Sequence, residues 1–175
     1  NHFKICVGYP VMAELFKQNY DEIETTVRIT NWGKRYVRLA NGREKTEENV
    51  VWADATFFSL FSIPVLEGDP HTALREPNSI AISRKMAEKY FPNEGALGQS
   101  LILDNDSNNK VTAVYEDIPA LSHFHFDMLR AMSGLEDAKS VTLIGGSEAY
   151  LYLLLKEGVP VQQLESKFPA FIEKY

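Results

Sequence analysis

Three polar residues in the second half of the chain are spaced like the start of a calcium-binding loop. Asp104, Asp106 and Asn108 stand two residues apart, as do the first oxygen ligands of an EF-hand. That pattern then requires glycine at its sixth position and glutamate at its twelfth, where this sequence has Asn109 and Tyr115. We therefore interpret the segment as a solvated hairpin turn, because Asp and Asn tolerate left-handed backbone conformations.

A second candidate for chemistry is a histidine pair followed by an aspartate. His123, His125 and Asp127 alternate along the chain, so on a strand their side chains would share one face. Imidazole and carboxylate groups are suitable zinc ligands. The interpretation that we favour is the polar face of a half-exposed strand near a junction of two lobes. We predict no bound metal and no other cofactor, although a metal at His123 and His125 stays the open alternative.

Serine and acidic residues that could serve catalysis lack the neighbours that catalysis needs. Ser83 is followed by Met86 where an SxxK motif has lysine, and Ser147 lacks a GxSxG frame. We expect a helix cap at Ser83 and a turn residue at Ser147. Adjacent residues of a strand point to opposite faces, so the acid pair Glu47-Glu48 cannot share a substrate, and it and Glu136-Asp137 are expected to be solvated. No catalytic residue is predicted.

Clustered aromatic residues are expected to pack rather than to bind. Phe57, Phe58 and Phe61 are too many large apolar groups for a solvated helix, and we assign them to a core. Trp32 and Tyr36 stand near a predicted turn and have a better claim to an exposed partner surface, since aromatic residues are enriched at interface hot spots.

Periodicity and turn residues mark the elements that would position these side chains. Apolar residues at helical spacing predict a helix over 11–20, with Pro10 at its start. Alternation predicts strands over 22–30, 35–40 and 45–53, and Asn41-Gly42 between the last two is a strong hairpin signal. A short helix follows over 55–61, capped by Thr56 or Asp54.

The second half of the chain continues with a mixed pattern. A buried strand over 79–82 leads into a helix capped by Ser83, and Pro92 ends that helix. Further strands are predicted over 101–103, 111–115, 122–129 and 148–156, the first two joined by a polar loop and the last in the centre of a sheet. A final helix begins at 161, and Pro169 should kink or end it. Two related β-α units thus flank an insertion.

The composition excludes several classes of protein. The chain has 175 residues and a net charge of −6, and its basic residues are dispersed among acidic ones, so nucleic acid is not an expected partner. Cys6 is the single cysteine, which leaves no intramolecular disulfide. We find no signal-peptide pattern, and the longest apolar run, residues 150–155, falls far short of the roughly 20 residues that span a bilayer. We expect a soluble part of something larger.

The order of punctuating residues from 57 to 129 resembles the MacB-like periplasmic core domain of ABC-transporter permeases, in the FtsX-like permease family and especially of Bacteroidetes type. The chain has neither flanking membrane helices nor the GxxxxGK[ST] motif of an ATPase, as a fragment of such a permease would. The segments that carry the resemblance are, in chain order, residues 11–30, 54–58, 65–70, 78–83 with Ala87, Phe91, Leu97 and Gly98, then 111–116, 122–124 and 148–164.

This resemblance implies an α+β fold of two lobes. A porter-like lobe is made of two separated β-α units, residues 1–50 and 119–175, and a mixed α/β sabre-like lobe, residues 51–118, is inserted between them. The resemblance implies no enzyme activity. It implies a position on the periplasmic side of the bacterial inner membrane, where the domain would transmit ATP-driven motion in export or in lipoprotein or peptide handling.

The partners implied are the protein's own transmembrane helices and a separate ATPase subunit or domain. A periplasmic adaptor, an outer-membrane channel, or an exported peptide or lipoprotein would complete the assembly. The alternative function is an extracytoplasmic ligand-binding sensor with a pocket between lobes. A hydrolase would need a nucleophile beside a base, which no motif proposes. We expect a monomer or weak dimer.

Overall fold

The computed structural model describes residues 7–8, 10–30, 33–39, 42, 45–104, 106–135 and 149–174. The strands are β1 Val7–Gly8, β2 Ile23–Thr30, β3 Lys34–Leu39, β4 Thr46–Ala53, β5 Val65–Gly68, β6 Ser79–Ser83, β7 Ser100–Leu103, β8 Asp106–Tyr115, β9 Met128–Ala131 and β10 Ala149–Leu155. The helices are α1 Val11–Asn19, α2 Phe57–Leu60, α3 Arg84–Tyr90, the 3₁₀ turn η1 Met132–Gly134, α4 Val161–Glu165 and α5 Phe168–Lys174. The predicted α+β class is confirmed.

Local sequence accounts for the first elements. Pro10 holds a φ of −54° at the start of α1, where its missing N–H costs nothing because the first helical N–H groups have no intrahelical partner. Ala13 and Phe16, three residues apart, are the buried residues of α1. β3 and β4 pair antiparallel from Val37 with Thr46 onwards, which confirms the predicted hairpin. Of its turn, Gly42 lies within the described residues.

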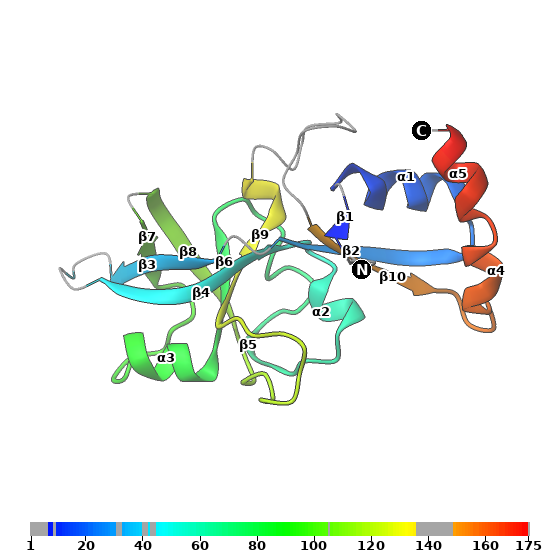
Figure 1. The fold of residues 1–175 in the computed structure, drawn as a ribbon. Helices are drawn as coiled ribbons and strands as arrows, with labels where there is room; N and C mark the ends of the chain where they lie inside the picture. The colour runs from blue at the N-terminus through cyan, green and yellow to red at the C-terminus, as the bar shows by residue number, and fades with distance from the viewer. Residues whose placement is uncertain are drawn as a thin grey trace.

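Six strands close on themselves in a ring. β4 pairs with β3, β3 with β7, β7 with β8, β8 with β6, β6 with β9, and β9 returns to β4. The closing pair is parallel and joins Val50–Ala53 to Met128–Ala131. β5 extends this group by pairing with β8. We call these six strands the ring; α3 lies beside it at the left of the view (Figure 1).

A smaller layer lies at the other end of the molecule. β10 runs antiparallel to β2 over six residue pairs, and β1 adds two pairs on the outer side of β10. α1 lies above these strands and packs with α4 and α5 at the end of the layer, although some 150 residues separate α1 from α5 in the chain (Figure 1). We call β1, β10, β2 and these three helices the β10–β2 layer.

Among the described residues, buried side chains form three clusters. One lies in the ring and under α3, and includes Val37, Ile80, Leu101 and Met128. A second joins the helices of the β10–β2 layer through Phe16, Leu164 and Phe171. The third lies between them and holds residues of both β2 and the ring, together with Phe57 and Phe58. The predicted core role of these two phenylalanines is confirmed.

The strand predicted over 122–129 is shorter than expected. Side-chain burial does alternate, with His123 and His125 exposed and Phe126 buried, but the strand β9 covers Met128–Ala131. Before it, the N–H of Ser122 bonds the carbonyl of Pro119, and that of Phe124 bonds the Ser122 hydroxyl. Such local bonds compete with strand pairing, so the alternation arises in a turn segment.

The polar hairpin loop predicted after residue 103 is largely strand. β8 begins at Asp106 and pairs there with Leu103, so the turn is tight. Asp104 has a φ of 55°, the left-handed conformation expected of Asp in such a turn.

The prediction that β10 lies in the centre of a sheet is wrong. β10 is second from the edge, beside the two-residue β1. On one face Leu151 and Leu153 pack against the helical cluster; on the other Tyr152 packs against the middle cluster, while Tyr150 and Leu154 stay exposed.

Pro169 does not end the last helix. The break lies before it, between α4 and α5, and Pro169 is the second residue of α5, in the first turn where proline is tolerated. Among the described residues, no helix is long and apolar enough to cross a bilayer.

The predicted lobe boundaries fall at two different kinds of position. The boundary between residues 50 and 51 cuts β4, while that between 118 and 119 lies in the connection from β8 to β9. Gly68, the last residue of β5, has a φ of +90°, and a Cβ there would lie 2.4 Å from the carbonyl oxygen of Thr112. Glycine is therefore required where β5 meets β8.

Candidate functional site

The two candidate histidines line a cavity of about 540 Å³. We call it the His123 cavity. It lies between β2 and β10 on one side and the turn segment before β9 on the other. Its lining residues are Ile29, Gly33, Asn49, Val51, His123, Phe124, His125, Phe126, Tyr150 and Tyr152.

One polar contact crosses this cavity region. Nε2 of His123 lies 3.0 Å from the hydroxyl of Tyr152, on β10, 29 residues further along the chain. Around this pair the aromatic rings pack edge to face, with Phe61 at 4.9 Å from Phe124 and 5.0 Å from Tyr152 between ring centroids. Such tilted arrangements are the favourable ones for aromatic rings, so the wall of the cavity is held by its own packing.

The proposed His-x-His-x-Asp ligand set is not assembled. His123 contacts Tyr152, whereas a carboxylate oxygen of Asp127 lies 3.5 Å from the Asn49 amide nitrogen. Asp127 is not among the residues that line the cavity. Within the described part of the chain, no three His, Cys, Asp or Glu side chains lie close enough together to hold a metal ion.

Asp104, the first residue of the segment that is spaced like a calcium loop, bonds to β3. One carboxylate oxygen of Asp104 accepts a hydrogen bond from the backbone N–H of Tyr36 at 3.1 Å, and the other lies 3.0 Å from Nη1 of Arg35. Asp104 thus ties the β7–β8 turn to β3. The side chains of Asp106 and Asn108 lie outside the described part of the structure, as do the candidates Cys6, Trp32, Glu136, Asp137 and Ser147.

Ser83 is a helix cap, as predicted. Its hydroxyl accepts a hydrogen bond from the N–H of Met86 at 3.4 Å, and the residue is buried. A carboxylate oxygen of Asp117 accepts a hydrogen bond from a second backbone donor of this turn, the N–H of Lys85, at 3.0 Å. Both bonds satisfy N–H groups that the start of a helix leaves without intrahelical partners.

The prediction that Glu47 and Glu48 are both solvated is wrong for Glu48. Glu47 is exposed and pairs with Lys34 at 3.0 Å. Glu48 is only 6% exposed and accepts hydrogen bonds from the Tyr90 hydroxyl, at 2.7 Å, and from Lys89. It shares the face of β4 that α3 covers, and a buried carboxylate requires such partners. Burial and the bond to Glu48 raise the pKa of Tyr90.

An ion pair that the sequence analysis missed joins β2 to the segment after β4. The guanidinium of Arg28 makes two bonds to the carboxylate of Asp54, at 2.7 and 2.9 Å. The backbone N–H of Arg28 donates a third at 2.8 Å. The side-chain bonds to Asp54 raise the pKa of Arg28. Asp54 therefore connects β2 to the segment that follows β4. Thr56, rather than Asp54, occupies the cap position of α2, without a side-chain cap bond.

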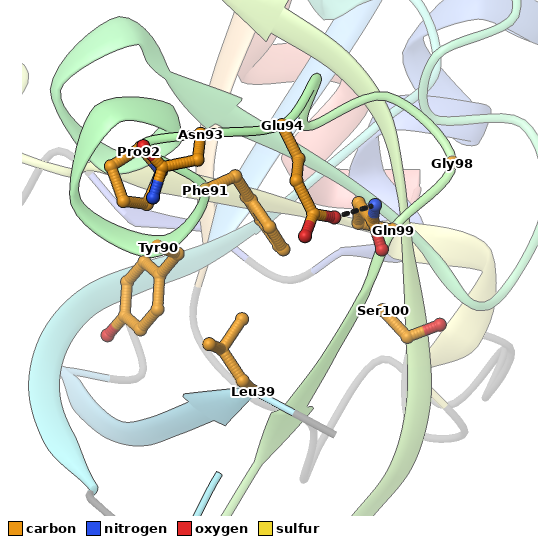
Figure 2. A pocket seen from close by; sticks show the side chains of 9 residues that line it. All are labelled: Leu39, Tyr90, Phe91, Pro92, Asn93, Glu94, Gly98, Gln99 and Ser100. Atoms are coloured by element: carbon orange, nitrogen blue, oxygen red, sulfur yellow. Dashed lines mark hydrogen bonds between the residues drawn. The ribbon is translucent and has the colours of Figure 1, made fainter. Parts of the chain in front are cut away.

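A second cavity, of about 390 Å³, opens between the end of α3 and the start of β7 (Figure 2). Leu39, Tyr90 and Phe91 form one wall. Its two long polar side chains, Glu94 and Gln99, bond each other at 3.0 Å. This pairing leaves the second cavity without a set of converging polar groups of the kind that usually orients a ligand.

The matches to known proteins agree with this architecture. The family model described as "MacB-like periplasmic core domain" matches residues 8–171. The chain belongs to this family. A MacB-like periplasmic core domain is part of an ABC-transporter permease and lies on the periplasmic side of the membrane, and such domains are generally not enzymes. A search of curated proteins finds no match.

Solved structures show the same fold. A domain of a proposed permease protein from Porphyromonas gingivalis has a TM-score of 0.84 at 21% identity, covering 97% of this chain and 78% of that chain. The periplasmic region of MacB from Actinobacillus actinomycetemcomitans has a TM-score of 0.71 at 13% identity, covering 96% and 74%. The extracellular domain of the noncanonic ABC-type transporter YknZ from Gram-positive bacteria has a TM-score of 0.64 at 16% identity, covering 93% and 79%.

Proposed function

We propose that this MacB-like domain performs no chemistry of its own and passes ATP-driven motion to cargo or to partner proteins. The observation that supports the proposal is that two parts of the molecule each have a buried cluster of their own, on either side of the middle cluster that joins them. The ring and the β10–β2 layer each have a cluster of buried residues, and the two clusters share no member. Bodies with cores of their own can shift as units when an external force acts on one of them.

The connection between these bodies is short along the backbone. β2 and β4 share two residue pairs, Ile29 with Ala53 and Thr30 with Trp52. The Arg28–Asp54 ion pair lies next to them, and the middle cluster fills the remaining contact. A short strand pairing flanked by packed side chains is suited to the small sliding and hinge movements by which domains respond to a distant event.

The two-lobed division of the sequence remains our proposal, although its residue ranges do not coincide with the ring and the β10–β2 layer. Residues 1–50 and 119–175 would supply the porter-like lobe, and residues 51–118 the inserted sabre-like lobe. Because β3, β4 and β9 pair within the ring, a spin label on β3 reports on the movement of the ring. The driving partner would be a separate ATPase subunit or domain, acting through transmembrane helices of the same permease. Cargo could then be an exported peptide or lipoprotein, with an adaptor and an outer-membrane channel as further partners.

Pulsed electron paramagnetic resonance on the whole transporter tests this proposal. With Cys6 replaced by serine, spin labels at Tyr36→Cys in β3 and Ile172→Cys in α5 report on the two bodies, since these side chains are 53% and 72% exposed. We expect the distance distribution to change between the nucleotide-free and the vanadate-trapped transporter. A control pair on the ring side, Tyr36→Cys with Leu66→Cys, should not change. Identical distributions for Tyr36 and Ile172 in both states would contradict the proposal.

The His123 cavity favours a second candidate function, a ligand-binding sensor. A sensor would change the Tyr36–Ile172 distance when ligand is added and would not respond to nucleotide. The same labelled transporter therefore separates the two functions.

A further inference from the structure

We propose that the His123 cavity is a binding site for a small, uncharged molecule that has an aromatic ring and one or two polar groups. The site lies where β2 and β10 of the β10–β2 layer meet the turn segment that leads into the ring. Nothing in the transmission of motion requires a cavity at this position.

The size of the cavity fits a small molecule. About 540 Å³ lies within the range of 300–1,000 Å³ that is usual for small-molecule sites. The floor is apolar, because Ile29, Val51 and Phe126 are buried among its lining residues. Binding of an apolar ligand that displaces water from this floor is therefore favourable.

Aromatic side chains supply the walls. Phe124 and Tyr152 are locked by the tilted packing of their rings, 5.8 Å apart between centroids. Tyr150 remains 39% exposed, so its ring offers an accessible surface. A flat aromatic ligand gains from offset or edge-on contact with such rings beyond the area that it buries. A wall that is already packed also costs little to organise on binding.

Among the described residues that line the site, the polar groups are few and carry no fixed charge. The His123–Tyr152 pair, His125 and Asn49 offer imidazole, hydroxyl and amide groups at the edge of the apolar floor. No Asp, Glu, Lys or Arg is among the ten described lining residues, whereas each of three other cavities has at least one. A charged ligand would lose its hydration without gaining an opposite charge, so the site selects an uncharged one.

Two fluorescent probes with the same ring skeleton test this selectivity on the 175-residue chain. N-phenylnaphthylamine is uncharged and brightens in apolar sites, and anilinonaphthalenesulfonate adds one negative charge. At about pH 8, where ordinary histidine is neutral, we expect saturable binding of the uncharged probe to one site and at least tenfold weaker binding of the sulfonate. Equal affinity for both probes, or no saturable binding, would overturn the proposal.

Variants locate the bound probe. Asn49→Trp places a large ring in the cavity from an exposed position, and Tyr150→Ser removes one wall; each should weaken binding of the uncharged probe at least tenfold. Tyr36→Ser, an exposed tyrosine outside the cavity, should leave the affinity unchanged. Circular dichroism melting identifies any variant that fails to fold, and the other variant then decides. Unchanged affinity in a folded Asn49→Trp or Tyr150→Ser protein would exclude this cavity. The assay involves no transport, so its result is independent of the transmission proposal.

Discussion

At the scale of single residues, Glu48 and Tyr90 form a hydrogen bond at the border of the buried apolar cluster of the ring. Tyr90 belongs to the buried cluster of the ring, and its hydroxyl donates to Glu48 at 2.7 Å. The Glu48 carboxylate also pairs with Lys89. Burial first, and then the bond to Glu48, raise the pKa of Tyr90, because a tyrosinate there would lose hydration and face a negative charge.

This raised pKa predicts a loss of stability in alkaline solution. Above about pH 10, Tyr90 of the unfolded chain releases its proton while the folded protein retains it. The unfolded state then binds fewer protons, so the free energy of unfolding falls as pH rises, by up to about 1.4 kcal/mol per pH unit for one tyrosine. Urea unfolding at a series of pH values measures this slope.

The Tyr90→Phe variant is the control for that slope. It should show a smaller decline above about pH 10, although not a flat line, because burial also raises the pKa of Tyr115. An identical decline in the variant and the parent protein would show that Tyr90 is not responsible.

At the scale of elements, α3 depends on the cap at its first turn. The seven-residue helix is too short to be stable alone, and it is fixed by Met86 and Tyr90 packing on the ring and by Ser83 and Asp117 at its N-terminus. Ser83 has two roles: it caps α3, and as the last residue of β6 it pairs with Tyr115 of β8.

Ser83→Ala should therefore destabilise the protein moderately. We expect a loss of about 1 kcal/mol in the free energy of unfolding, within the usual range of about 0.5–2 kcal/mol for a lost N-cap. The bond from Lys85 to Asp117 remains and limits the effect. Urea unfolding of Ser83→Ala beside Ser59→Ala, an exposed serine of α2, measures it. A loss no larger than that of the Ser59 variant would refute the capping role.

At the scale of the whole molecule, aromatic packing joins the two ends of the chain. The ring of Phe16 in α1 lies 5.3 Å from that of Phe168 and 4.7 Å from that of Phe171, both in α5. These contacts belong to the cluster of the β10–β2 layer alone. If that layer is a body of its own, its loss should be local rather than global.

Hydrogen exchange of the Phe16→Ala protein checks this. We expect the variant to lose about 3–5 kcal/mol of stability, as for other buried phenylalanines. Amide protection should fall in α1, α4, α5 and β10 and be retained in the ring. The matched control is Phe58→Ala, since both side chains are 8% exposed but Phe58 packs in the middle cluster beside Tyr115. It should reduce protection in β8. A uniform loss of protection in Phe16→Ala would argue against separate bodies.

The amino-acid sequence by itself determined the elements whose causes are local. Pro10 and Ser83 start helices, Asn41-Gly42 predicts the hairpin of β3 and β4, and the number of large apolar groups around Phe57 and Phe58 predicts a core. Each of these signals acts over a few residues, through backbone restriction, a capping bond or the burial of one face. The order of turns and strands also carried the family resemblance, because those positions are set by the same local rules.

Tertiary structure alone decided which distant residues meet. The parallel pairing of β4 with β9 closes the ring across some 75 residues, the Glu48 carboxylate becomes buried because α3 folds over it, and His123 meets Tyr152 rather than Asp127. Strand pairing and ion-pair formation at long range depend on the packing of the whole chain, and no local pattern encodes a partner that far away. The cavity that we propose as a binding site is a product of that packing.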